Sequence, residues 1–172
     1  MKCECPDLIT GVCKWNKKDI TYWEEMNFSG FTREEVKALY DEAWMTWARV
    51  ADFNPRRVDS ADKANVVARE AFLGLALGWS GLPCGVSDNA QLGQKYKSNT
   101  RWTKKALLET MRHEIGHALG LGHMRGTIMS PSAMGFDKLT EKDIKEIQER
   151  YGKRTSPEPD PDKLDKEEFK IF

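Results

Sequence analysis

The fold of this 172-residue chain is decided by eleven residues, His113–His123, which read HEIGHALGLGH. The chain has three histidines in total, and all three lie in this stretch. Their spacing is H-E-x-x-H-x-x-G-x-x-H. Because neutral imidazole is a common metal ligand, three imidazoles at a fixed spacing indicate a metal site.

A helix over residues 104–119 would place the first two histidines of this pattern where they can bind one metal ion. His113 and His117 are four residues apart, so they would lie on one face and reach the same ion. Glu114 would point to the neighbouring side, beside the metal, where a base acting on a bound water belongs.

The second half of the pattern predicts a turn. Gly120 suits the left-handed residue that ends a helix, and the chain can then return with His123 as a third ligand. Three protein ligands with one open position are typical of catalytic zinc, whereas structural zinc is closed by four.

A chance match is the competing interpretation. The five residues H-E-x-x-H alone occur by chance on surface helices. Gly120 and His123 extend the match, and Met129 follows in Gly126–Pro131, GTIMSP. The longer pattern favours a real metal site.

Composition narrows the class of protein. The chain is 40% apolar and 31% charged, with 27 basic and 27 acidic residues, which is ordinary for one soluble domain. The balance of charge predicts no nucleic-acid or anionic-membrane partner. No apolar run approaches the roughly 18 residues that span a bilayer.

The compartment stays open. The first residues lack the apolar stretch of a secretory signal. The protein is therefore exported by another route, carried in a virion or retained inside a cell, or else it is secreted and its signal has been removed.

The four cysteines, Cys3, Cys5, Cys13 and Cys84, leave three alternatives open. A disulfide framework, a second zinc site and free thiols all fit an even number of cysteines.

Periodicity and capping signals predict the elements. Thr32–Glu35 is a capping box that opens an amphipathic helix to about Val50, and Thr140 caps a last helix that stops at Gly152. Thr103 caps the histidine helix. The predicted strands, each followed by turn residues, are 19–23, 53–58, 64–69, 71–79 and 90–96.

These elements suggest three parts: an irregular arm (1–18), one domain (19–152) and a flexible acidic and proline-rich tail (153–172). The tail ends in Phe169-Lys170-Ile171-Phe172. This apolar tip is either a loose terminus or a docking peptide for a partner.

The chain resembles the catalytic domain of the matrixins, the matrix-metalloproteinase branch of the metzincin zinc peptidases. The resemblance runs from about Cys3 to Gly152 and is most specific at His113–His123, Ile128–Pro131 and Leu139–Ile144. It implies an α+β, zincin-like fold. That fold has a twisted, mostly parallel sheet of about five strands, a long helix, a zinc-binding helix, a Met-turn and a C-terminal helix.

The resemblance also implies roles for single residues. His113, His117 and His123 would hold one zinc ion, Glu114 would be the general base, and Met129 would form the apolar floor of the Met-turn without binding the metal. Family members typically carry a second zinc bound by further histidines, and this chain has none left for it. No aspartate-rich loop supports calcium.

The N-terminal residues 2–7, KCECPD, resemble the cysteine switch of the matrixin pro-segment. In that alignment Cys3 would be an inhibitory zinc ligand, because a thiolate can take the open position. A structural or incidental thiol is the alternative.

The resulting functional hypothesis is a zinc-dependent endopeptidase that hydrolyses protein or peptide substrates. By resemblance, the substrate would lie along the strand near Leu73–Trp79, and an apolar pocket would lie between the zinc helix and Ser130–Leu139. The alternatives are a non-catalytic structural or binding module that kept the metal, and a different zinc hydrolase such as an amidase.

Overall fold

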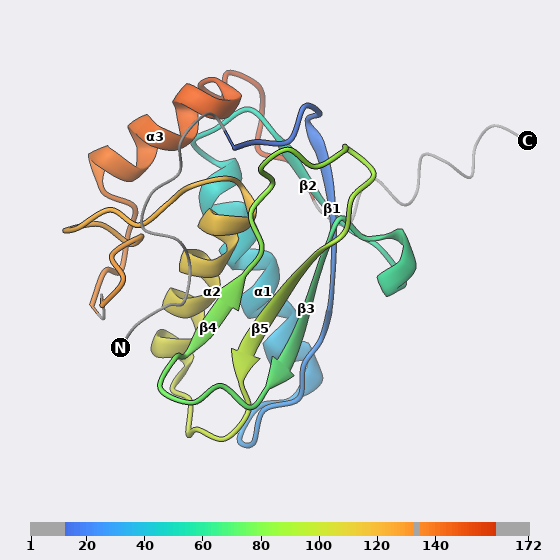
Figure 1. Cartoon of the computed structure of the whole chain (residues 1–172), viewed down its shortest axis with the longest axis vertical. Helices are drawn as coiled ribbons and strands as arrows, with labels where there is room; N and C mark the ends of the chain where they lie inside the picture. The colour runs from blue at the N-terminus through green and yellow to red at the C-terminus, as the bar shows by residue number, and fades with distance from the viewer. Residues whose placement is uncertain (1–12, 133–134, 161–172) are drawn as a thin grey trace, which may run out of the picture.

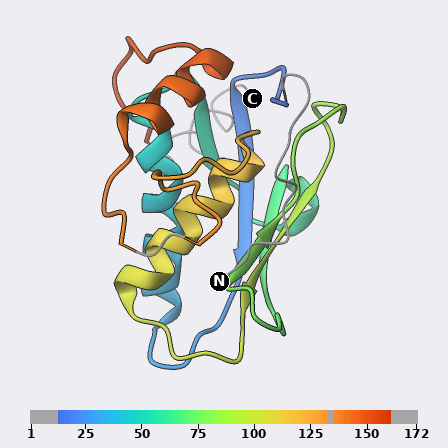
Figure 2. The same ribbon diagram turned by 60° about the vertical axis from the view of Figure 1, so that its left-hand side comes forward.

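The structure, a computed structural model, describes residues 13–132 and 135–160. Within these ranges, one sheet forms a layer, and helices α1 (Arg33–Ala48) and α2 (Lys104–Ala118) cover one of its faces (Figures 1 and 2). A third helix, α3 (Glu141–Tyr151), lies at the end of the molecule where α1 and α2 finish (Figure 1). This arrangement confirms the predicted α+β, zincin-like fold class.

The sheet has the order β2-β1-β3-β5-β4 among the described residues. Its strands are β1 (Asp19–Glu25), β2 (Asn54–Arg57), β3 (Val66–Ala71), β4 (Gly78–Ser80) and β5 (Leu92–Lys97). The pairs β1–β2, β1–β3 and β3–β5 are parallel, and β4 runs antiparallel to β5 at the edge. The sheet is therefore mostly parallel, as predicted.

The segment 71–79 was predicted to be one strand, and this is wrong for residues 72–77. Phe72 and Leu75 are 79% and 88% exposed instead of facing a core. Lys97, the last residue of β5, already donates its N–H to Leu77 O at 2.9 Å. Because β5 ends there, residues 72–76 have no strand to pair with in the described part of the chain.

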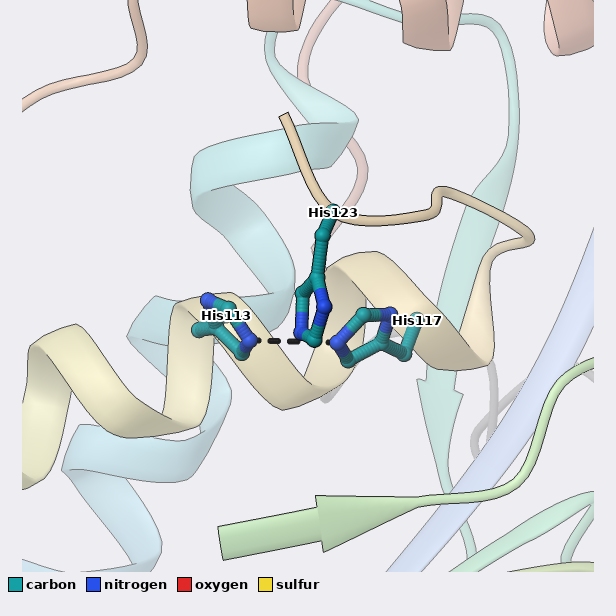
Figure 3. A group of neighbouring side chains, drawn as sticks. All are labelled: His113, His117 and His123. Carbon is teal, nitrogen blue, oxygen red and sulfur yellow. Dashed lines mark hydrogen bonds between the residues drawn. The ribbon is translucent and has the colours of Figure 1, made fainter. Parts of the chain in front are cut away.

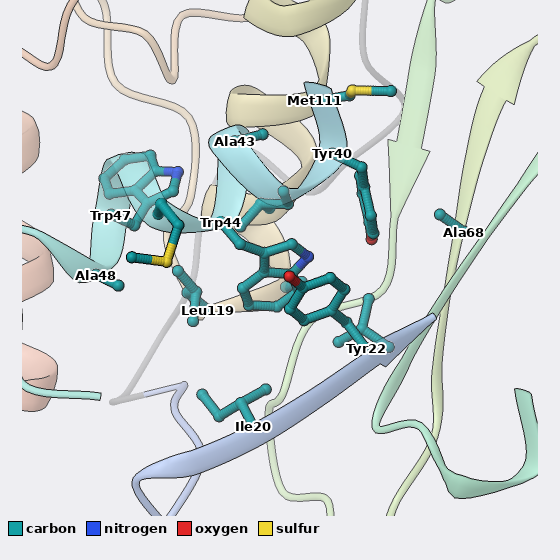
Figure 4. Packing of buried hydrophobic residues seen from close by; sticks show 14 of the residues in the cluster. Ile20, Tyr22, Tyr40, Ala43, Trp44, Trp47, Ala48, Ala68, Met111 and Leu119 are labelled. Atoms are coloured by element: carbon teal, nitrogen blue, oxygen red, sulfur yellow. The ribbon is translucent and has the colours of Figure 1, made fainter. Parts of the chain in front are cut away.

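Aromatic side chains fill the space between α1 and the sheet. The capping box of Thr32 and Glu35 sets the start of α1, and the buried stripe of this helix then faces β1. The Trp44 ring stacks on that of Tyr22 with centroids 5.0 Å apart (Figure 4). Trp47 Nε1 donates to Arg112 O at 2.9 Å, which ties α1 to α2 beside the histidines.

Residues on both sides of the predicted domain pack against it. Cys13 and Trp15 are 4% and 2% exposed, and Cys13 forms a disulfide with Cys84. At the other end, Arg154 donates to the carbonyls of Ala48 and Phe53. The boundaries at 18 and 152 stay predictions, and the tip of the tail lies outside the described residues.

Candidate metal centre

The burial of one face of α2 sets the direction of its polar face. Thr103 Oγ1 accepts the N–H of Ala106 at 3.1 Å and caps the helix start. Leu107, Met111 and Ile115 are 0% exposed and belong to the core. With these residues against the core, His113 and His117 project together from a different side of the helix (Figure 3).

Gly120 makes the turn that the sequence predicts. Its φ is +105°, a region that side-chain-bearing residues rarely adopt. The turn is closed by hydrogen bonds from Gly120 N to His117 O (2.8 Å) and from Leu121 N to Gly116 O (2.9 Å). The chain then returns across the helix and brings His123 to the other two histidines.

The three histidines converge (Figure 3). One ring nitrogen from each lies within 4.8 Å of those of the other two. The ring centroids are 4.7 Å apart for His113 and His117, 4.9 Å for His117 and His123, and 5.5 Å for His113 and His123. Within the described ranges, this is the only group of three or more metal-ligating side chains so arranged.

Backbone carbonyls fix which ring nitrogen carries the proton. His113 Nδ1 lies 2.7 Å from Ile128 O, and His117 Nδ1 lies 2.7 Å from Leu121 O. A carbonyl only accepts, so each Nδ1 must donate, and in a neutral ring the lone pair is then on Nε2. The two Nε2 atoms are 3.1 Å apart. Facing lone pairs at this distance suit a cation between them.

Burial also keeps these rings in the form that binds metal. Loss of solvent lowers the pKa of His113 to about 4 and lowers that of His117 well below its ordinary value. Both rings are thus neutral at neutral pH. Together with the ring of His123, these two imidazoles match the nitrogen donor set of a catalytic zinc site with three protein ligands.

Glu114 lies against the sheet. Its side chain is 2% exposed, and Oε2 has no hydrogen-bond partner. A Cβ added to Gly78 would come within 2.5 Å of Glu114 Oε1, so the carboxyl group touches the backbone of β4. Burial raises the pKa of Glu114 well above its ordinary value.

Met129 packs directly against the metal helix. It is 0% exposed, and a Cβ on Gly116 would approach its Sδ to 2.3 Å. Gly116 directly precedes His117, so the absence of a side chain on Gly116 lets the thioether lie beside this part of the helix. The Met124 N–H donates to Met129 O at 3.0 Å and closes the turn.

Asp143 is a supporting residue that the sequence interpretation missed. It is 0% exposed, and its Oδ2 accepts from Ile128 N at 3.3 Å and from Thr140 N at 2.8 Å. Ile128 O in turn accepts from His113. The start of α3 therefore supports the backbone that orients the His113 ring. The Thr140–Asp143 capping box marks the helix start in the sequence, but it does not indicate this contact.

The fold is zincin-like, and its three histidines could hold a metal ion. The sequence model of the matrixin family matches residues 86–152, which include the whole centre. Mouse matrix metalloproteinase-19 is 31% identical over 159 residues, covering 84% of this chain and 30% of that protein. Human matrilysin is 29% identical over 183 residues (90% and 67%), and 5-MMP of Arabidopsis thaliana is 27% identical over 203 residues (88% and 55%). These comparisons show that the chain is similar to the matrixin family over most of its length.

The chain spans between 30% and 55% of the length of the first three curated relatives that it matches. No helix in the described part of the chain is long and apolar enough to cross a membrane. Cys3, the predicted inhibitory ligand, lies outside the described residues. The absence of a second zinc and of calcium stays a prediction.

Proposed function

We propose that the chain is a zinc-dependent endopeptidase. The proposal is carried by one observation: three histidines present a converging donor set, and a buried carboxyl group with an unpartnered oxygen follows the first of them. A site that only held a metal for structural reasons would gain nothing from Glu114, because an unpaired buried carboxyl group costs stability. Similarity to the matrixin family supports the same activity.

His113 and His117 would hold the zinc ion through their Nε2 atoms, and His123 would hold it through one of its ring nitrogens. When bound, zinc supplies Lewis-acid activation of water and of a peptide carbonyl. The carboxylate of Glu114 takes a proton from the water as it attacks that carbonyl, and passes the proton to the departing amine. A carboxylate whose pKa is raised by burial accepts this proton more readily than an exposed one.

The sheet edge offers a place for an extended substrate. In the described part of the chain β4 pairs only with β5, so its other side carries no strand. A peptide in extended conformation would add itself along β4 by backbone hydrogen bonds. Because the Glu114 carboxyl group touches Gly78 in β4, a peptide bound there would lie close to the proposed base.

The experiment is cleavage of a mixed peptide library, read by mass spectrometry. The wild-type protein is compared with Glu114→Ala and with wild type after chelation. Glu149→Ala, an exposed glutamate on α3, is the matched control. We expect new peptide termini with wild type and the control only.

The proposal fails if the wild-type protein produces no cleavage beyond that seen with chelated protein and with Glu114→Ala. This holds if the result is the same after thiol-modifying treatment. Release of ammonia or side-chain products without new peptide termini would instead favour an amidase.

A further inference from the structure

The end of the metal helix is covered by residues from the beginning of the chain. The carbonyl oxygen of Cys13 lies 1.8 Å from the position that a Cβ on Gly120 would occupy. The backbone of Cys13 therefore rests directly on the turn that follows α2. A side chain could not be added to Gly120 without moving one of the two backbones.

Trp15 attaches the same segment to the last carbonyls of α2. Its indole Nε1 donates to Ala118 O at 2.9 Å, and the ring is 2% exposed. Its backbone N–H donates to Tyr151 Oη at 3.2 Å, and Tyr151 Oη donates to Leu119 O at 2.7 Å. The carbonyls that a helix end leaves unsatisfied are thus bound by this segment and by α3.

The clamped turn holds two of the three ligands. Leu121, the residue after Gly120, supplies the carbonyl that accepts from His117 Nδ1. His123 follows two residues later and reaches the centre only because the chain reverses at Gly120. A shift of the turn would therefore move one ligand and release the hydrogen bond that orients another.

Two further contacts attach residues 13–16 to the loop between β4 and β5. The disulfide joins Cys13 to Cys84, which lies 71 residues further along the chain in the loop before β5. In addition, Asn16 N donates to Asp88 Oδ1 at 2.9 Å. Cys13 is buried whereas Cys84 is exposed, so an external thiolate can approach the disulfide through Cys84.

We infer that residues 13–16 form a positioning clamp on the metal centre, and that the Cys13–Cys84 disulfide makes zinc affinity depend on redox state. Two electrons and two protons from a dithiol donor convert the disulfide into two thiols, and the donor becomes a disulfide. Once reduced, the clamp loses its covalent attachment, and the turn that carries His123 is less constrained. The inference rests on the proposed zinc site.

The test is zinc affinity measured by competition with a chromophoric chelator, which requires no substrate. The protein carries Cys3→Ser and Cys5→Ser, so that reduction changes only the Cys13–Cys84 pair. It is compared before and after treatment with a phosphine reductant, which takes its oxygen from water and is removed by desalting. Far-UV circular dichroism fixes a temperature at which both forms are folded.

We expect the zinc dissociation constant to rise about tenfold or more on reduction, the range seen when partners that orient metal ligands are lost. Further replacement of Cys13 and Cys84 by serine should give the same weakened affinity. That result shows that loss of the clamp, and not zinc binding by new thiols, is the cause. Equal dissociation constants for folded oxidised and reduced protein would overturn the inference.

A second variant covers the case in which the reduced protein does not fold. Trp15→Phe keeps the disulfide and an aromatic ring at this position but removes the donor to Ala118 O, and it should also weaken zinc binding in the oxidised protein. The matched control is Trp23→Phe on β1, whose indole donates to Glu25. Unchanged affinity in Trp15→Phe contradicts the clamp. Oxidised protein that binds no zinc at all would instead overturn the proposed function, and the clamp with it.

Discussion

Each of the two helical histidines in this centre is oriented by a backbone carbonyl on a different segment. His113 donates to Ile128 O in the Met-turn, and His117 donates to Leu121 O in the turn after α2. Hydrogen bonds of this kind fix the tautomer and the ring orientation of a metal ligand. His123 completes the donor set from outside the helix, so the centre requires both the helix and the turn.

Replacement of His123 by alanine should therefore leave a helix that folds but a centre that binds zinc poorly. We expect the affinity to fall by more than the roughly 10- to 100-fold that loss of a supporting partner causes. Chelator competition measures this change. Arg125→Ala, an exposed residue two positions later, is the control and should bind zinc like wild type. Unchanged affinity in the His123 variant would exclude this residue as a ligand.

At this scale the sequence predicts the ligands but not their supports. Three histidines at a distinctive spacing indicate a shared ion, because few other structures need that pattern. Every residue has a backbone carbonyl, so nothing in the sequence distinguishes Ile128 and Leu121 as acceptors. The contact between Glu114 and Gly78 cannot be predicted from the sequence either, because it depends on how α2 packs against β4.

Among the elements, α3 has a role beyond its own packing. Its capping residue Thr140 accepts from Asp143 N and donates to Asp143 Oδ2. Asp143 also receives the N–H of Ile128 from the Met-turn. A change in the first turn of α3 is therefore transmitted to the backbone beside His113.

Thr140→Ala should lower the free energy of unfolding by about 1 kcal/mol, because the helix loses its N-cap and Asp143 loses a partner. Urea unfolding of the zinc-free protein measures the change. Thr155→Ala, an exposed threonine after α3, should stay within about 0.5 kcal/mol of wild type. Equal effects of the two substitutions would contradict the role of the cap.

The helix starts follow from local sequence, whereas the edge of the sheet does not. Each helix is capped by a threonine whose side chain accepts the backbone N–H three residues later; these are Thr32, Thr103 and Thr140. The segment 71–79 has the composition of a strand, but strand formation needs a partner, and β5 is too short to pair with residues 72–76. Pairing partners lie far apart in sequence, so composition alone places such a strand incorrectly.

The whole molecule holds the metal helix from three directions. The core lies along its buried face, the Met-turn lies against Gly116, and both Cys13 and Arg150 contact Gly120. The bond from Trp15 to Ala118 joins residues 103 positions apart. The pairing of Cys13 with Cys84 could not be predicted either, because four cysteines allow several connectivities.

Removal of zinc should lower the unfolding temperature of the whole domain. A ligand that binds only the folded state stabilises it by about 2.7 kcal/mol at 100 times its dissociation constant. Scanning calorimetry with and without added zinc measures the shift. His117→Ala is the control and should not respond to zinc. A wild-type protein whose unfolding temperature ignores zinc would contradict binding at this centre.

The most direct test of the account is a zinc titration of the metal-free protein, with bound metal and peptide cleavage measured in the same samples. Wild type should gain cleavage in proportion to zinc and reach a plateau at one ion per chain. Glu114→Gln should bind zinc to the same plateau yet lose about 100-fold or more in cleavage rate, the contribution of a general base. Cleavage without zinc, or wild-type cleavage by Glu114→Gln, would contradict the proposed centre and its base.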